Sequence, residues 1–349
     1  MFEFDWMLLC LAFCGGVFGA AVGALPSFVL CGVGALLGGL YGMSTGSTDN
    51  VVDMWVTWGP LVGPQTAFAG GAVAAVYAKR RGLFENGRDI CSPLMGLNAP
   101  DVLLVGGVFG MVGALLTLVC SKIPNIGEYA SNNAIATAIV LTMILGRVLF
   151  GQTGVFGKVA QGTNRWAGSD AGCWLTWQHD WPQILIIACA VGLPASHLAL
   201  TVPASGLIIF GLGCFIFTFM LFGAKVPVFH NIALASLLAV GATQNLWWGL
   251  AMAILVAFLC ELSAMLFCAH GDSHIDPPTV SLMLTGIIQP IFLAAGVMQV
   301  AGESFDFAPI IAIALFAIGF PVLLTALRSI QPSEATLPAD AEEVLLNQD

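Results

Sequence analysis

The stretch HGDSHIDPPTVSL, residues 270–282, places histidine and aspartate side chains between two apolar runs. Its four alternating ionisable residues are His270, Asp272, His274 and Asp276. Imidazole and carboxylate groups bind several divalent metal ions, and every second residue of an extended segment lies on the same side, so a metal site is one hypothesis. However, polar loop residues before a helix need no metal to explain them, and no second histidine cluster accompanies this one. We therefore expect neither a metal nor another cofactor.

The same stretch has the sequence pattern of a helix start. Proline fits the first helical turn, so Pro277 and Pro278 predict a helix that is capped by the Asp276 carboxylate. If this helix begins inside the membrane, its free N–H groups and partial positive charge face whatever lies before it. Asp276 and Thr279 are therefore candidate site residues.

Glu261 lies well inside the apolar run AILVAFLCELSAMLFC. A carboxylate at that depth costs at least about 2.5 kcal/mol on insertion scales, so it should face the helix bundle and be protonated or paired. We predict His230 as its partner, because an imidazole titrates near neutral pH. The candidates for handling a coupling ion or proton are Glu261, His230 and Asp276. The alternative is a neutral Glu261 that is hydrogen-bonded to a neighbouring helix.

Two other apolar segments begin irregularly. WGPLVGPQTAFAGG has two Gly-Pro pairs before Gln65, and KVPVFHNIALAS has a proline before His230. Proline removes a backbone donor and glycine weakens a helix, so both segments are predicted to be discontinuous or re-entrant. YASNNAIATAIVL provides a further polar helix start. The predicted substrate-binding residues are Gln65, Thr66, Asn132, Asn133, Asn231 and Thr279.

The composition indicates a membrane protein. Only 9% of the 349 residues are charged, 58% are hydrophobic, and the mean hydropathy is +0.93. Backbone groups in lipid must be paired internally, which favours helices of roughly 20 residues. We therefore predict an all-α integral membrane protein that has the lipid bilayer as a partner and does not bind nucleic acid.

About eleven transmembrane helices are predicted from the apolar runs. They are residues 6–23, 27–43, 59–78, 102–121, 132–150, 182–200, 204–223, 227–243, 246–268, 277–298 and 308–327. With the N-terminus outside and the C-terminus in the cytoplasm, only Lys122 among the ten basic residues falls outside, as the positive-inside rule requires. The absence of an Asn-x-Ser/Thr site fits a bacterial cytoplasmic membrane.

The two halves of the chain align with one another in three ungapped registers. These registers pair Asp101 with Asn245, Glu128 with Asp272, Asn132 with Asp276, Gly15 with Gly192, and Gln65 with His230. Five helices are an odd number, so the second copy would enter the membrane from the opposite side, giving a 5+5 inverted-topology repeat. The predicted parts are repeat 1 (1–150), a cytoplasmic linker (151–181), repeat 2 (182–298), one additional helix (299–328) and an acidic disordered cytoplasmic tail (329–349).

This arrangement resembles inverted-repeat secondary transporters in general. The leading hypothesis is a proton- or cation-coupled secondary active transporter that moves a small polar or anionic solute by alternating access, with its site near the midplane between the repeats. A passive channel and a membrane scaffold subunit of a larger complex are the alternatives. The sequence has no P-loop, GxSxG or HExxH motif, so no enzyme is expected. A homo-oligomer is compatible with the sequence.

Overall fold

The computed structural model of the protein describes residues 5–46, 51–167, 174–205, 207–302 and 306–330. Within these residues the secondary structure is entirely helical, apart from one isolated bridge between Ile126 and Tyr129. The predicted all-α class is therefore confirmed for this part of the chain. From residue 331 onward, the predicted acidic tail lies outside the described residues.

Helices follow the apolar runs of the sequence. Those of the first half are α1 (Trp6–Val22), α2 (Ala24–Thr45), α3 (Ala69–Arg80), α4 (Pro100–Cys120) and α5 (Ala134–Phe150). Those of the second half are α6 (Trp181–Thr201), α7 (Ile208–Phe215), α8 (Phe217–Leu221), α9 (His230–Thr243), α10 (Leu246–Ser263), α11 (Pro277–Ala294) and α12 (Ala308–Arg328). Short π- or 3₁₀-helical turns are η1 (Asp53–Thr57), η2 (Pro64–Phe68), η3 (Met95–Leu97), η4 (Pro203–Ser205) and η5 (Ala264–Cys268).

Six of the described helices are long and apolar enough to cross a membrane: α2, α4, α6, α10 extended by η5, α11 and α12. Shorter apolar helices are α1, α5, α9 and the pair α7–α8. These lengths and compositions are compatible with insertion into a membrane. Each of the predicted apolar runs contains at least one helix.

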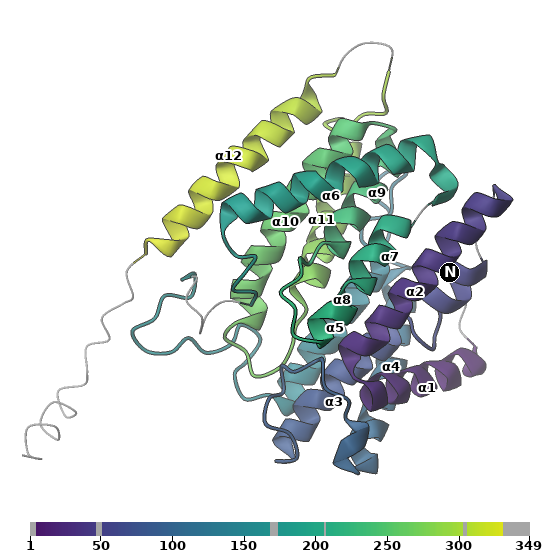
Figure 1. Ribbon diagram of the computed structural model, residues 1–349, viewed down its shortest axis with the longest axis vertical. Coiled ribbons are helices and arrows are strands. Elements are labelled where there is room, and N and C mark those ends of the chain that lie inside the picture. The colour runs from purple at the N-terminus through teal and green to yellow at the C-terminus, as the bar shows by residue number, and fades with distance from the viewer. Residues whose placement is uncertain (1–4, 47–50, 168–173, 206, 303–305, 331–349) are drawn as a thin grey trace, which may run out of the picture.

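The two halves pack their helices in corresponding ways. In the first half, α1 packs on α3 and α4, and α4 also packs on α3 and α5. In the second half, α6 packs on α9 and α10, and α10 also packs on α9 and α11. Contacts between the halves run along α2 with α7 and along α5 with α11 (Figure 1). Figure 1 also shows α12 along the outer edge, where it packs on α10 and α6.

Glycines allow the backbones of α1 and α4 to touch. A Cβ atom added to Gly16 would lie 2.1 Å from the carbonyl oxygen of Gly106. A Cβ on Gly110 would lie 2.4 Å from the carbonyl oxygen of Ala12. Small residues thus give the close helix approach that is common in membrane proteins.

The chain is irregular before α3 and before α9, as the proline-containing patterns predicted. Turns occupy residues 58–63, and η2 begins at Pro64, five residues later than the predicted start of that span. Residues 224–229 are not helical, and α9 begins at His230 and not at residue 227. The Gly-Pro and Val-Pro pairs delay each helix because proline lacks a donor and restricts the residue before it.

Candidate functional site

Polar side chains cap the starts of α5 and α11. The Asn133 side-chain oxygen accepts a hydrogen bond from the Ala136 N–H at 3.1 Å. The Asp276 carboxylate accepts one from the Thr279 N–H at 2.9 Å and another from the Thr279 hydroxyl. The predicted helix start at Asp276, with two prolines in its first turn, is therefore confirmed.

Two helix starts lie beside the interior of a neighbouring helix. A Cβ atom on Gly286 of α11 would lie 2.7 Å from the backbone nitrogen of Asn133. One on Gly213 of α7 would lie 2.8 Å from the Cα of His230, where α9 begins. The starts of α5 and α9 thus pack directly against α11 and α7.

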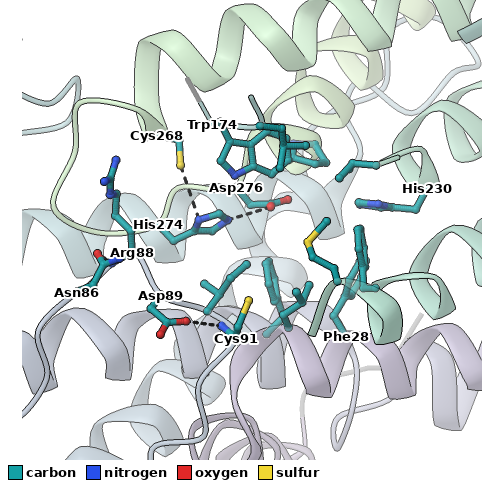
Figure 2. A pocket seen from close by; sticks show the side chains of 18 of the residues that line it. Phe28, Asn86, Arg88, Asp89, Cys91, Trp174, His230, Cys268, His274 and Asp276 are labelled. Atoms are coloured by element: carbon teal, nitrogen blue, oxygen red, sulfur yellow. Dashed lines mark hydrogen bonds and ion pairs between the residues drawn. The ribbon is translucent and has the colours of Figure 1, made fainter. Parts of the chain in front are cut away.

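A first cavity of about 310 Å³ lies between the 86–91 loop, α2 and the starts of α9 and α11. Much of its wall is aromatic, from Phe28, Phe68, Trp174 and Phe217. Its polar lining consists of Asn86, Arg88, Asp89, His230, His274 and Asp276. Figure 2 shows His274 next to Asp276, with the His230 ring pointing into the cavity from the opposite wall.

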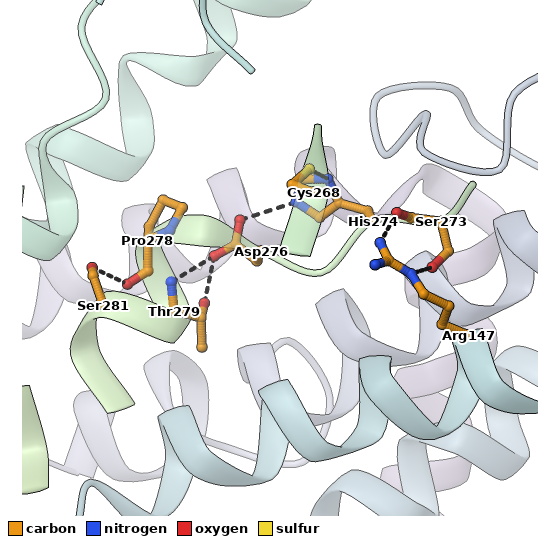
Figure 3. Close-up of polar contacts among 8 residues, drawn as sticks. All are labelled: Arg147, Cys268, Ser273, His274, Asp276, Pro278, Thr279 and Ser281. Atoms are coloured by element: carbon orange, nitrogen blue, oxygen red, sulfur yellow. Dashed lines mark hydrogen bonds and ion pairs between the residues drawn. The ribbon is translucent and has the colours of Figure 1, made fainter. Parts of the chain in front are cut away.

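His274 and Asp276 form a buried pair in the first cavity. The distance from Nε2 of His274 to Oδ1 of Asp276 is 3.1 Å, and the two residues are 4% and 6% exposed. The other ring nitrogen, Nδ1, lies 3.7 Å from the Cys268 sulfur. Both Asp276 oxygens are therefore occupied, one by His274 and one by Thr279 (Figure 3). Sequence reasoning considered His274 only as a metal ligand and missed this pairing.

A second cavity, of about 180 Å³, touches four helix starts. These starts contribute Pro64 of η2, Asn133 before α5, His230 of α9 and Thr279 of α11. The remaining wall is apolar and includes Phe28, Trp58, Ile135, Ile139, Phe210, Leu234, Leu238 and Leu282. No carboxylate is among the described residues that line it.

Two side chains line both cavities, Phe28 of α2 and His230 of α9. Their rings meet edge to face with centroids 5.0 Å apart. His230 is 4% exposed, and its Nδ1 has no hydrogen-bond partner. We call this pair of residues the septum, because both side chains belong to the walls of the two cavities.

Arg147, in the last turn of α5, holds the loop before the His274–Asp276 pair. Its guanidinium is fully buried and donates to the Ser273 hydroxyl at 2.7 Å and to the Val155 carbonyl at 2.8 Å. It also donates to the backbone carbonyl of Ser273 (Figure 3) and to that of Phe267. In the sequence, Arg147 was only one of the basic residues that indicate the orientation in the membrane, and the pattern did not reveal this hydrogen-bond network.

A family model described as "Family of unknown function (DUF7973)" matches residues 1–167 and 161–305. The chain belongs to this family. The two matched segments meet in the loop that joins α5 to α6. No curated protein matches the chain, and no solved structure does.

Gln65 and Thr66 lie outside both cavities of this DUF7973 protein. Gln65 donates to the Trp58 carbonyl at 2.7 Å, and Thr66 donates to the Gly63 carbonyl at 2.9 Å. Both residues line a separate space of about 30 Å³, together with Thr117 and others. Their side chains therefore face α1 and α4, not the septum.

Asn132 and Asn231 also lie outside both cavities. The Asn132 amide donates to the Cys120 carbonyl at 3.1 Å. The Asn231 amide donates to the Ser281 hydroxyl at 3.1 Å and borders a space of about 20 Å³. Of the predicted substrate-binding residues, only Asn133 and Thr279 line the second cavity.

Glu261 has a different partner from the expected one. It is buried and accepts a hydrogen bond from Arg328 at 3.0 Å, and that guanidinium also donates to the His179 carbonyl. The prediction of His230 as its partner is wrong, because α12 brings Arg328 to this face of α10 while His230 points into the two cavities. Glu261 is paired, as its depth required.

The four alternating ionisable residues of segment 270–282 do not share one environment. His270 contacts the Arg165 carbonyl, whereas Asp272 accepts hydrogen bonds from the Gln152 N–H and the Thr153 hydroxyl. Burial raises the pKa of Asp272, but these hydrogen bonds outweigh it, and the net pKa is below the ordinary value. In the described part of the chain, no group of three His, Cys, Asp or Glu residues is placed to hold a metal ion.

Proposed function

We propose that this protein is a secondary active transporter that moves a small polar or anionic solute across a membrane by alternating access. The supporting observation is the septum: two cavities, both reaching polar helix starts, share the side chains of Phe28 and His230 in their walls. Alternating access needs a central site that opens to each side in turn. A wall made of side chains can open through small movements of α2 against α9.

The corresponding packing in the two halves supports an inverted repeat of five helices each, with eleven spans in total and α12 outside the repeat. The related pairs α2–α7 and α5–α11 contact one another, as helices around a pseudo-twofold axis would. Matched small spaces add support: Thr66 and Thr117 line one, and Asn231 and Glu261 line the other. The sequence registers align the first pair with the second.

Coupling to a proton or cation is assigned to His230 and to the His274–Asp276 pair. These groups all line the first cavity, whereas Glu261 is engaged by Arg328 at the contact with α12. With the N-terminus outside, the 86–91 loop is cytoplasmic, so the first cavity faces the cytoplasm and the second faces outward. A bacterial cytoplasmic membrane fits this orientation.

Thiol labelling from each side of the membrane tests this proposal. Cys91 lines the first cavity, and a Leu238→Cys variant places a thiol in the second. We expect a membrane-impermeant maleimide to modify Cys91 only in inverted vesicles and the introduced thiol only in right-side-out vesicles, as read by peptide mass spectrometry. Cys91→Ser is the control for the first site. Modification of both thiols from the same face would contradict the proposal.

A channel is the second candidate, because the same two cavities would form a pore if the septum opened fully. Proteoliposome flux separates the two functions. Saturable uptake against a gradient supports a transporter, and non-saturating downhill flux supports a channel.

A further inference from the structure

We infer that the second cavity binds a small organic monoanion, with its charged end at His230 and its apolar body toward Trp58. This inference depends on the proposed function, because it names the substrate class of the same site. A short-chain carboxylate is the simplest molecule of this kind.

The polar lining of the cavity favours an anion. Asn133 and His230 belong to the starts of α5 and α9, where unpaired N–H groups and the helix dipole attract negative charge. The start of α11 contributes no free N–H, because Pro277 and Pro278 have none and the Thr279 N–H is bonded to Asp276. His230 supplies the second observation: it is nine-tenths buried, lines the cavity, and leaves Nδ1 without a hydrogen-bond partner. A buried polar atom without a partner is costly, and a bound ligand would remove that cost.

The distribution of charge disfavours a cation. No described residue that lines the second cavity carries a carboxylate. Asp276 lines the first cavity and already bonds His274 and Thr279 through its two oxygens. A cation in the second cavity would therefore lose its hydration without gaining an ionic partner.

The apolar wall limits the ligand to one charge and a short body. Phe210, Leu234 and Leu238 offer no polar group to a second carboxylate, whose burial would be unfavourable. The volume of about 180 Å³ equals about six water molecules at ~30 Å³ each. That space suits a short hydrocarbon body.

Ligand-induced stabilisation of the purified full-length protein tests this inference. The probes are butyrate, n-butylammonium, n-butanol and succinate, which differ in charge at similar size. We expect butyrate to raise the melting temperature in a saturable manner, with the other three having at least tenfold weaker effects. Equal or stronger stabilisation by butylammonium, or no stabilisation by butyrate, would overturn the inference.

Two variants locate the binding site. His230→Gln should weaken butyrate binding at least tenfold, and Leu238→Trp, which fills the second cavity, should abolish it. Cys91→Ser alters only the first cavity and should leave binding unchanged. Unchanged binding in both His230→Gln and Leu238→Trp would place butyrate elsewhere and refute the assignment. Thiol labelling from opposite faces does not depend on butyrate, so it shows separately whether the proposed transport function fails.

Discussion

At the scale of single residues, the local sequence predicted which side chains cap helices, but it did not predict which distant side chains form pairs. Cap residues were predictable, because Asp276 before two prolines is a local pattern. The Arg147 network and the Glu261–Arg328 pair were not predictable, because their partners are as many as 126 residues away in sequence for Arg147 and 67 for Glu261. Pairings between residues so far apart depend on tertiary packing, and the residues next to each partner in the sequence do not indicate it.

Cys91, in the loop beside the first cavity, provides a prediction of pH dependence. Burial, and then the charge of Asp89, raise the pKa of this thiol to about 11. Because the thiolate is the reactive form, its alkylation rate should rise about tenfold per pH unit from pH 7 to 10. An unperturbed thiol, with a pKa near 8.5, should level off above about pH 9. Peptide-resolved maleimide kinetics measure this rate, and a plateau near pH 9 would contradict it.

At the scale of elements, glycines allow two helix starts to approach the neighbouring helices closely. The sequence predicted that Asn132 and Asn133 open a helix, and the structure makes Asn133 the cap. It could not predict that this cap would rest against Gly286, because glycines recur in every apolar run and none marks its own contact.

A pair of glycine substitutions tests this packing. Gly286→Ala would place a Cβ atom 2.7 Å from the Asn133 backbone, so α5 and α11 must shift apart. We expect a loss of about 1–3 kcal/mol in unfolding free energy, measured as a lower apparent melting temperature. Gly241→Ala in α9 is the matched control, since nothing lies within 4 Å of its added atom. Equal effects of the two substitutions would show that the close contact between α5 and α11 has little energetic weight.

At the scale of the whole molecule, composition was enough to predict an all-helical protein, and the apolar runs located its helices. The approach of α2 to α7 and of α5 to α11 could not be read from the sequence, because runs of similar apolar residues do not specify their neighbours. For the same reason, the division of the central space into two cavities emerged only from the structure.

The prediction at this scale is that a substitution in the septum makes the protein leak protons. Phe28→Ala removes one of the two side chains that the cavity walls share, so we expect the cavities to merge. We expect at least a tenfold faster dissipation of a pH gradient in proteoliposomes, followed with an internal pH-sensitive dye. Phe156→Ala, at an exposed loop position, should leave the leak at the wild-type level. A Phe28→Ala protein that folds and stays tight would show that other residues close the path.

The proposed closure at the septum has an electrical consequence. Where water fills both hollows and the septum closes the path between them, a transmembrane voltage falls mainly across the septum. Moving one elementary charge through the septum at 100 mV then changes its energy by about 2.3 kcal/mol, concentrated in a single short step. Turnover that carries net charge should therefore respond steeply to membrane potential, and electroneutral exchange should not.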